Sequence, residues 1–133
     1  MAVSAGATGS SDDLGPIAVV LLVEDNMLIA LDTEDALLEA GVQRVVIAAS
    51  AEAALAALAN ATPDFAVLDF NLGAETSERV AEALAAAGIL FCYATGYGDA
   101  IVGQATQPPC GILKKPYSPA DIAAMLERAA AQR

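Results

Sequence analysis

The chain has 133 residues, a length that fits one domain with a substantial hydrophobic core. Apolar residues make up 56% and charged residues 17%, which excludes the composition of a disordered protein. The net charge is −11, so nucleic acids and anionic membrane surfaces are not expected as partners. Histidine is absent, which excludes histidine metal sites, histidine-dependent triads and phosphorylation of this chain on histidine.

The first fifteen residues are predicted to form a flexible tail. They are rich in Ala, Gly and Ser, and they lack the basic start and apolar stretch of a signal peptide. No apolar run has the length of a membrane span, so we expect a cytoplasmic protein in which residues 16–133 form one domain. Cys92 and Cys110, both in apolar strand-like runs, are then expected to be buried free thiols rather than a disulfide.

Strand-like and helical patterns alternate from residue 17 onward. Residues 17–23 are continuously apolar and rich in β-branched side chains, as in strands buried on both faces of a parallel sheet. The other predicted strands are residues 45–48, 65–69, 89–94 and 110–113. Helices are predicted at residues 27–40, 51–60 and 77–87, weakly at 99–105, and from 118 onward, with a loop at 71–73.

Capping residues support the predicted helix boundaries. Asn26 and Ser50 are favoured N-caps, and Gly41 and Gly88 follow predicted helix ends, where glycine is common. Five alternating strand–helix units argue for an α/β fold in which one parallel sheet carries helices on both faces. In such folds ligands bind beyond the carboxyl ends of the strands.

Charged and hydroxyl side chains stand directly after the predicted strands. They are Glu24, Asp25, Asp69, Thr95 and Lys115. Because the carboxyl ends of parallel strands meet at one edge of a sheet, we expect these side chains to form one cluster. Taken singly, each has an ordinary structural explanation, such as a turn or a helix cap. Their conjunction at the ends of successive strands favours a functional site.

A magnesium site is the first chemistry that this cluster predicts. Carboxylates held together repel one another, and Mg²⁺, which prefers oxygen ligands, would remove the conflict. Asp25 and Asp69 are the predicted direct ligands, and Glu24 is expected to act through water. The backbone carbonyl of Asn71 is a further predicted ligand.

Phosphoryl transfer is the second predicted chemistry. An aspartate carboxylate such as that of Asp69 can attack a phosphoryl donor and form an aspartyl-phosphate. Lys115 would neutralise the phosphoryl oxygens, and the Thr95 hydroxyl would donate a hydrogen bond to one of them. Gly96 is expected to leave room beside Thr95, because a side chain there would crowd the site.

These residues resemble the receiver domain of two-component response regulators over residues 17–131. The acidic pair Glu24-Asp25 looks like the start of the family's site, and Asp69, 44 residues after Asp25, stands at the family's phosphoacceptor. Thr95 matches the family's hydroxyl residue. The resemblance implies a flavodoxin-like (βα)5 fold with strand order 2-1-3-4-5, a Mg²⁺ cofactor, and phosphorylation by a histidine kinase or phosphotransfer protein.

The pair Lys115-Pro116 is similar to the family's Lys-Pro pair, whose peptide bond is usually cis. Lys114 is set aside because the family's lysine directly precedes the proline. Ordinary receivers carry Tyr or Phe three residues before this lysine, where this chain has Ile112, so the usual threonine–aromatic switch is not expected. Tyr97 is a candidate substitute.

Residues 91–98, with the sequence Phe-Cys-Tyr-Ala-Thr-Gly-Tyr-Gly, look like the motif of the FATGY subgroup of receivers. Many members of this subgroup are stand-alone proteins of alphaproteobacteria, and some have been associated with general stress signalling. Tyr93 stands where the motif has Phe. The resemblance therefore implies a stand-alone response regulator.

The first predicted helix has two apolar faces. Ile29, Thr33, Ala36, Leu37 and Ala40 share one face, and we expect them to face the sheet. Met27, Leu31 and Leu38 then lie on the opposite face, and an apolar stripe pointing outward suggests a partner surface. The resemblance adds that histidine kinases and phosphotransfer helices usually dock on the first helix of receivers. In the alternative, the helix is rotated and Leu28, Leu31 and Leu38 belong to the core.

Three functions are compatible with these features. The favoured one is a single-domain response regulator, a monomer or weak dimer that signals through contacts with an unidentified downstream protein. The second is a phosphorylation-independent binding module with the same fold, which the absence of an aromatic residue at Ile112 favours. The third, a Mg²⁺-dependent phosphatase, ranks last because that class places its nucleophile on the first strand and a second Asp at the position of Asn71.

Overall fold

The computed structural model describes residues 17–73, 75–96 and 107–132. The predicted N-terminal tail, Tyr97 and the weak helix predicted at residues 99–105 lie outside the described residues. Among the described helices, none is long and apolar enough to cross a membrane.

One parallel sheet forms the centre of the structure. Its strands are β1 (Val19–Val23), β2 (Arg44–Ala48), β3 (Phe65–Asp69), β6 (Leu90–Thr95) and β7 (Ile112–Lys114). They lie in the order β2-β1-β3-β6-β7, and every neighbouring pair is parallel. Numbered along the chain, these five strands have the order 2-1-3-4-5, so the predicted flavodoxin-like arrangement is confirmed.

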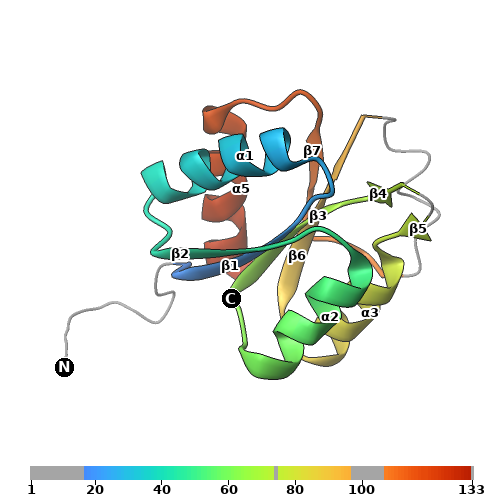
Figure 1. Ribbon diagram of the computed structural model, residues 1–133. Helices are drawn as coiled ribbons and strands as arrows, with labels where there is room; N and C mark the ends of the chain where they lie inside the picture. Colours follow the sequence, from blue (N-terminus) through green and yellow to red (C-terminus); the bar gives the residue numbers. More distant parts are fainter. Residues whose placement is uncertain (1–16, 74, 97–106, 133) are drawn as a thin grey trace.

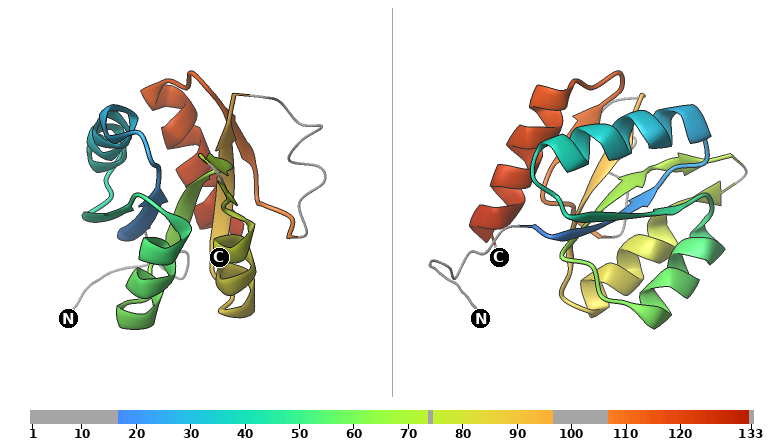
Figure 2. Two further views of the ribbon diagram at one scale, coloured as in Figure 1. Left: turned by 45° about the vertical axis from the view of Figure 1, so that its right-hand side comes forward. Right: turned by 60° about the vertical axis from the view of Figure 1, so that its left-hand side comes forward.

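Helices cover both faces of this sheet. They are α1 (Met27–Glu39), α2 (Ala51–Asn60), α3 (Glu78–Ala86) and α5 (Pro119–Gln132). Figures 1 and 2 show α1 and α5 on one face and α2 and α3 on the other. The predicted N-caps are confirmed: Asn26 Oδ1 accepts a hydrogen bond from Leu28 N at 3.0 Å, and Ser50 Oγ accepts one from Ala53 N at 3.1 Å.

Each face of the sheet has its own apolar core. Alternate side chains of β1 point to opposite faces, so Val20 and Leu22 join the core under α1 and α5, whereas Leu21 and Val23 join the core under α2 and α3. All four are almost completely buried, which explains the uninterrupted apolar run at this strand. The cysteines are free as predicted, although Cys110 is only half-buried.

Two element predictions were wrong. The predicted loop at residues 71–73 contains β4 (Asn71–Leu72), which pairs antiparallel with β5 (Glu75–Thr76) in a small hairpin. Burial of Leu72 draws this segment toward the core, which a loop pattern did not indicate. The last strand starts at Ile112 rather than at Cys110, although Cys110 N already donates to Phe91 O at 2.9 Å.

Helix α1 exposes apolar side chains to solvent. They are Met27, Leu28, Leu31 and Leu38, which are 43–78% exposed. The predicted outward stripe of Met27, Leu31 and Leu38 is therefore confirmed, and the alternative that placed leucines 28, 31 and 38 in the core is wrong. The predicted inward face was too long, because Ala40 is the exposed C-cap of the helix.

Candidate functional site

The predicted site residues gather at the carboxyl edge of the sheet. Glu24 and Asp25 follow β1, Asp69 ends β3, Thr95 ends β6 and Lys115 follows β7. Because β1, β3, β6 and β7 are successive neighbours in the sheet, the strand ends bring together residues as far as 91 positions apart in the chain.

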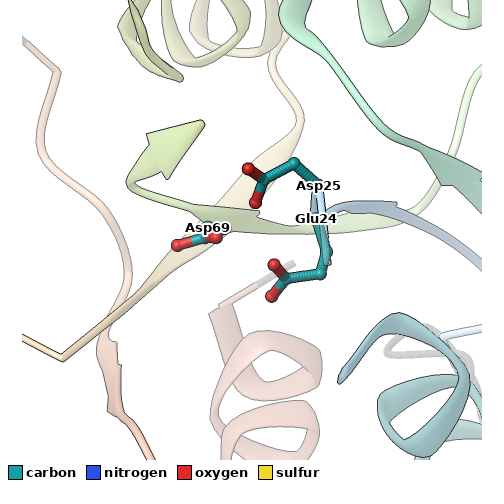
Figure 3. Close-up of side chains that lie close together, drawn as sticks. All are labelled: Glu24, Asp25 and Asp69. Carbon is teal, nitrogen blue, oxygen red and sulfur yellow. The ribbon is translucent and has the colours of Figure 1, made fainter. Parts of the chain in front are cut away.

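Three carboxylates converge at the centre of this edge. One carboxylate oxygen from each of Glu24, Asp25 and Asp69 lies within 4.8 Å of the other two. Figure 3 shows the three side chains turned toward one another. Glu24 and Asp69 are buried, whereas Asp25 is exposed, so the cluster opens to solvent on the side of Asp25. Oxygen donors at this spacing fit a hard divalent cation such as Mg²⁺.

Lys115, which directly follows the edge strand β7, joins the carboxylates. Its Nζ lies 3.0 Å from Glu24 Oε1 and 3.2 Å from Asp69 Oδ2. The backbone N–H of Lys115 donates to Thr95 O at 2.9 Å, which places the lysine next to the end of β6. The Lys115-Pro116 peptide bond is cis, and Lys114 is exposed without an ion pair to any described residue.

The electrostatics of Asp69 are unusual for an aspartate. Burial, together with the hydrogen bonding and negative charge of Glu24, raises the pKa of Asp69 to about 7, although Lys115 opposes the shift. Burial lowers the pKa of Lys115, but its hydrogen bonds and ion pairs with Glu24 and Asp69 outweigh that effect and raise it. A cation bound here would therefore compete with a proton on Asp69 near neutral pH.

Both carboxylate oxygens of Glu24 already have partners. Oε1 accepts from Lys115, and Oε2 accepts a hydrogen bond from Asn26 N at 3.1 Å. These contacts fit the predicted role of Glu24 as a ligand that acts through water. Asp25 and Asp69 are then better placed than Glu24 to bind a metal ion directly.

The loops after β3 and β6 border the carboxylates. Gly73 has a φ of 74°, and a Cβ added there would lie 3.9 Å from Asp25 Oδ2, so the hairpin passes close to the site. Asn71, the source of the predicted carbonyl ligand, is half-buried in that hairpin. Thr95 is 1% exposed. A Cβ at Gly96 would meet no described atom within 4 Å, so the space beside Thr95 is open on this side among the described residues.

No protein-family model matches the chain, and no curated protein matches it. Solved structures do match it. The CheY-like response regulator receiver domain from Methanospirillum hungatei JF-1 has a TM-score of 0.74 and 23% identity, covering 87% of this chain and 95% of that chain. The chemotaxis response regulator CheY4 of Vibrio cholerae has a TM-score of 0.75 and 25% identity, covering 85% of this chain and 98% of that chain. The chain has the CheY-like receiver fold.

A third solved structure with the receiver fold is also similar over most of its length. The response regulator REC domain of PhyR from Erythrobacter litoralis has a TM-score of 0.76 and 21% identity, covering 86% of this chain and 90% of that chain. These similarities establish the fold of the present chain. They do not distinguish a FATGY-type receiver from other receivers.

One contact beside the site was not predicted from the sequence. The hydroxyls of Thr33 in α1 and Tyr117, two residues after Lys115, lie 2.7 Å apart. Thr33 is buried, so this bond ties the segment after Lys115 to the interior side of α1. The two residues are 84 positions apart, and no local pattern pairs them before the receiver fold brings α1 and α5 together.

An aromatic residue does lie beside Ile112, on the neighbouring strand. Ile112 in β7 is paired with Tyr93 in β6, and Tyr93 is fully buried. The Tyr93 ring meets Phe70 and Phe91 edge-on, with centroid distances of 5.1 and 5.5 Å. Its hydroxyl has no hydrogen-bond partner in the described structure. The aromatic ring nearest to Ile112 along this strand pair, that of Tyr93, is therefore held inside the core.

Proposed function

We propose that the chain is a single-domain response regulator whose Asp69 accepts a phosphoryl group from a histidine kinase or phosphotransfer protein. The supporting observation is the contact of Lys115 Nζ with both Asp69 and Glu24, beside the exposed carboxylate of Asp25. The Asp69 carboxylate, the candidate nucleophile, thus has a cation and metal-binding carboxylates beside it. In this proposal residues 16–133 form the receiver domain of a cytoplasmic protein.

The transfer step uses the buried carboxylate of Asp69. One of its oxygens bonds to phosphorus as the phosphorus–nitrogen bond of the donor breaks, and the imidazole nitrogen keeps the electron pair. Lys115, 3.2 Å from Asp69, would neutralise the negative charge that collects on the phosphoryl oxygens. The Thr95 hydroxyl would donate to one of those oxygens after transfer.

The carboxylate cluster would hold Mg²⁺ during this reaction. Asp25, Asp69 and the backbone carbonyl of Asn71 are the proposed direct ligands, and Glu24 is the ligand through water. The bound ion would supply additional positive charge for the phosphoryl oxygens. Because burial and the neighbouring Glu24 raise the pKa of Asp69 to about 7, metal binding at neutral pH is expected to release a proton from Asp69.

The exposed stripe on α1 supports a docking site for the phosphodonor. Met27, Leu31 and Leu38 present an apolar surface on the helix that starts directly after Glu24 and Asp25. Apolar side chains with this exposure favour contact with a partner protein. We propose that the kinase or phosphotransfer helix binds here.

Signal output is proposed to occur through protein contacts of a stand-alone, FATGY-type receiver. An aspartyl-phosphate carries roughly −1.5 to −2 of charge and brings strong acceptor oxygens to the site. Ile112 cannot provide the usual aromatic switch, so Thr95 and the segment after it are the proposed route. The motif at residues 91–98 supports this assignment.

Phosphorylation tests the proposal directly. Incubation with acetyl phosphate or a phosphorylated kinase, in the presence of Mg²⁺, should add one phosphoryl group that mass spectrometry detects. Asp69→Asn should abolish the modification, whereas Glu52→Gln, an exposed control on α2, should not change it. A wild-type chain that stays unmodified with both donors would favour the second candidate, a phosphorylation-independent binding module, which the residue Ile112 supports.

The two adjacent lysines provide a matched pair of variants. Lys115→Ala should retain Mg²⁺ binding but lose the conformational response to phosphorylation, because it removes the cation that contacts Asp69. Lys114→Ala removes the same charge from an exposed position and should respond as the wild type does. Chemical-shift changes on phosphorylation measure this response, and the opposite pattern would contradict the assignment of Lys115.

A further inference from the structure

Two free cysteines lie opposite each other on neighbouring segments of the sheet. Cys92 is in the middle of β6, and Cys110 stands just before β7 begins at Ile112. Both side chains pack in the core under α1 and α5. The two thiols therefore share one face of the sheet.

The hydrogen bonds to β6 reveal an extra residue just before β7. Cys110 N donates to Phe91 O at 2.9 Å. Tyr93 N donates to Gly111 O at 3.3 Å, where a regular parallel ladder would use the carbonyl of Cys110. Cys110 and Gly111 therefore both stand opposite Cys92, in the manner of a β-bulge.

This bulge brings Cys110 to the same side of the sheet as Cys92. Side chains alternate along a strand, and Ile112 packs in the α2–α3 core whereas Leu113 packs in the α1–α5 core. Regular alternation would turn Cys110 toward α2 and α3, away from Cys92, yet it packs in the α1–α5 core. Neighbouring strands lie about 4.8 Å apart, and disulfides join residues whose Cα atoms are about 4.4–6.8 Å apart. The two cysteines are thus placed for a disulfide.

Helix α5 covers the bulge at Gly111. A Cβ added there would lie 2.7 Å from Met125 Cε and 2.8 Å from Met125 Sδ, so a side chain at this position would displace Met125. The same Cβ would lie 3.5 Å from Arg128 Nη1. The bulge therefore has one apolar side chain and one cation of α5 beside it.

The two thiols differ in exposure. Cys92 is fully buried, whereas Cys110 is half-buried. Burial raises the pKa of Cys92 well above its usual range, and the charge of Cys110 raises it further, which agrees with their opposite positions. Burial also raises the pKa of Cys110, but the guanidinium of Arg128 opposes that shift. Cys110 is therefore the thiol that an oxidant reaches first.

We propose that Cys92 and Cys110 form a redox-responsive site at which a peroxide converts the two thiols into a disulfide. The Cys110 thiolate attacks one peroxide oxygen, the oxygen–oxygen bond breaks, and the second oxygen of hydrogen peroxide leaves as water, so that Cys110 becomes a sulfenic acid. The Cys92 sulfur then attacks the Cys110 sulfur, the sulfur–oxygen bond breaks, and the hydroxyl leaves as water with the proton of the Cys92 thiol. The two thiols lose two electrons and two protons, and the peroxide is reduced to two waters.

The disulfide would covalently join the two strands that support the carboxylate site. β6 ends in Thr95, and β7 leads directly to Lys115, whose backbone N–H donates to Thr95 O at 2.9 Å. A dithiol reductant would restore both thiols. Because formation of this bond does not involve Asp69, the test uses the unphosphorylated chain, and its outcome is independent of the proposed function.

Treatment of the reduced, folded protein with hydrogen peroxide tests the proposal. Mass spectrometry should show a loss of about 2 Da, the two thiol hydrogens, and digestion should release one peptide pair that joins Cys92 to Cys110. A dithiol reductant should reverse the change. The rate should not depend on protein concentration, because both thiols belong to one chain. A link between two chains, or thiols that stay free or oxidise separately to sulfinic acids, would overturn the proposal.

Single-cysteine variants test the order of the two steps. In Cys92→Ala, Cys110 should accumulate as a sulfenic acid, which a cyclic diketone traps as a stable adduct. In Cys110→Ala, the buried Cys92 should react roughly tenfold more slowly than Cys110 does. Circular dichroism shows whether both variants remain folded, and the peptide link in the wild type depends on neither of them. Faster oxidation of Cys92 would overturn the proposed order.

Two arginine variants test the cation beside the bulge. Arg128→Gln removes the guanidinium near Cys110 and should slow the oxidation about threefold, because it lowers the thiolate fraction. Arg79→Gln removes the same charge from an exposed position on α3 and should leave the rate unchanged. Equal rates in the two variants would overturn the role assigned to Arg128.

Discussion

The two faces of the sheet are built differently. The face under α2 and α3 contains the aromatic cluster of Phe70, Phe91 and Tyr93, and its helices bury small alanines such as Ala51 and Ala54. The face under α1 and α5 carries a large groove, and α1 leaves apolar side chains exposed. One face thus holds the aromatic cluster in its core, whereas the other combines a core with a groove and exposed apolar side chains.

This difference indicates a division of roles between the faces. Large buried rings contribute strongly to stability because their removal leaves cavities. Exposed apolar and acidic side chains contribute little to stability but provide a surface that partners recognise. The carboxylate site lies at the strand ends, where it borders the helices of both faces.

The largest effect on stability is expected from the aromatic cluster. Tyr93→Ala should lower the free energy of unfolding by about 3–5 kcal/mol, because it leaves a cavity in the α2–α3 core. Leu28→Ala on α1, where the side chain is 78% exposed, should change it by less than about 0.5 kcal/mol. Urea unfolding monitored by circular dichroism measures both, and similar losses for the two variants would remove the contrast between the faces.

Tyr93→Phe provides a control that keeps the ring. The Tyr93 hydroxyl is buried without a hydrogen-bond partner among the described residues, so its removal should leave stability unchanged or raise it by up to about 1 kcal/mol. A loss of stability would show that the hydroxyl has a partner, such as a buried water.

Ionisation of Asp69 in the carboxylate site should lower the free energy of unfolding as the pH rises. The pKa of Asp69 is raised to about 7 from 3.8, so its contribution to stability is fully present below about pH 4 and is lost as the pH rises through 7. In metal-free protein, Asp69→Asn should therefore be more stable than wild type at pH 8, with a smaller difference at pH 5. Thermal unfolding in the presence of a chelator measures this difference.

Asp25→Asn is the matched control for this pH dependence. Asp25 belongs to the same cluster but is exposed, so its replacement should have a smaller effect at pH 8. Addition of Mg²⁺ should reduce the difference between wild type and Asp69→Asn, because it stabilises only the intact site. A difference that does not depend on pH would contradict the raised pKa.

A smaller effect is expected from the hydrogen bond between Thr33 and Tyr117. Tyr117→Phe should cost about 1 kcal/mol, because it leaves the buried Thr33 hydroxyl without its partner. A double-mutant cycle with Thr33→Val should give a coupling energy of similar size. Additive losses in the cycle would show that the 2.7 Å contact does not tie α1 to the segment after Lys115.

The smallest effect on stability is expected on the exposed stripe of α1. Met27→Glu/Leu31→Glu should change stability by less than about 0.5 kcal/mol, yet slow phosphoryl transfer from a kinase about tenfold. Ala56→Glu/Ala59→Glu adds the same charge to exposed positions on α2 and should leave transfer unchanged. Unchanged kinetics in the α1 variant would remove the stripe as a docking site.

Much of the fold could be predicted because local patterns agreed with the tertiary structure. The apolar run of β1, the caps Asn26 and Ser50, and the alternation of strands and helices all indicated a parallel α/β sheet. The β4–β5 hairpin was missed because two-residue strands carry almost no periodicity.

The sequence by itself determined which residues stand at the strand ends and therefore which chemistry is available there: three carboxylates, a hydroxyl and a lysine. Tertiary structure decided which lysine reaches the carboxylates, how strongly burial perturbs Asp69, and that Thr33 meets Tyr117. It also decided that Asp32, Asp35 and Glu39 border an apolar groove. The physical reason is that strand and helix identity follow from neighbouring residues, whereas pKa values, ion pairs and grooves depend on groups that meet only after the sheet and helices have packed.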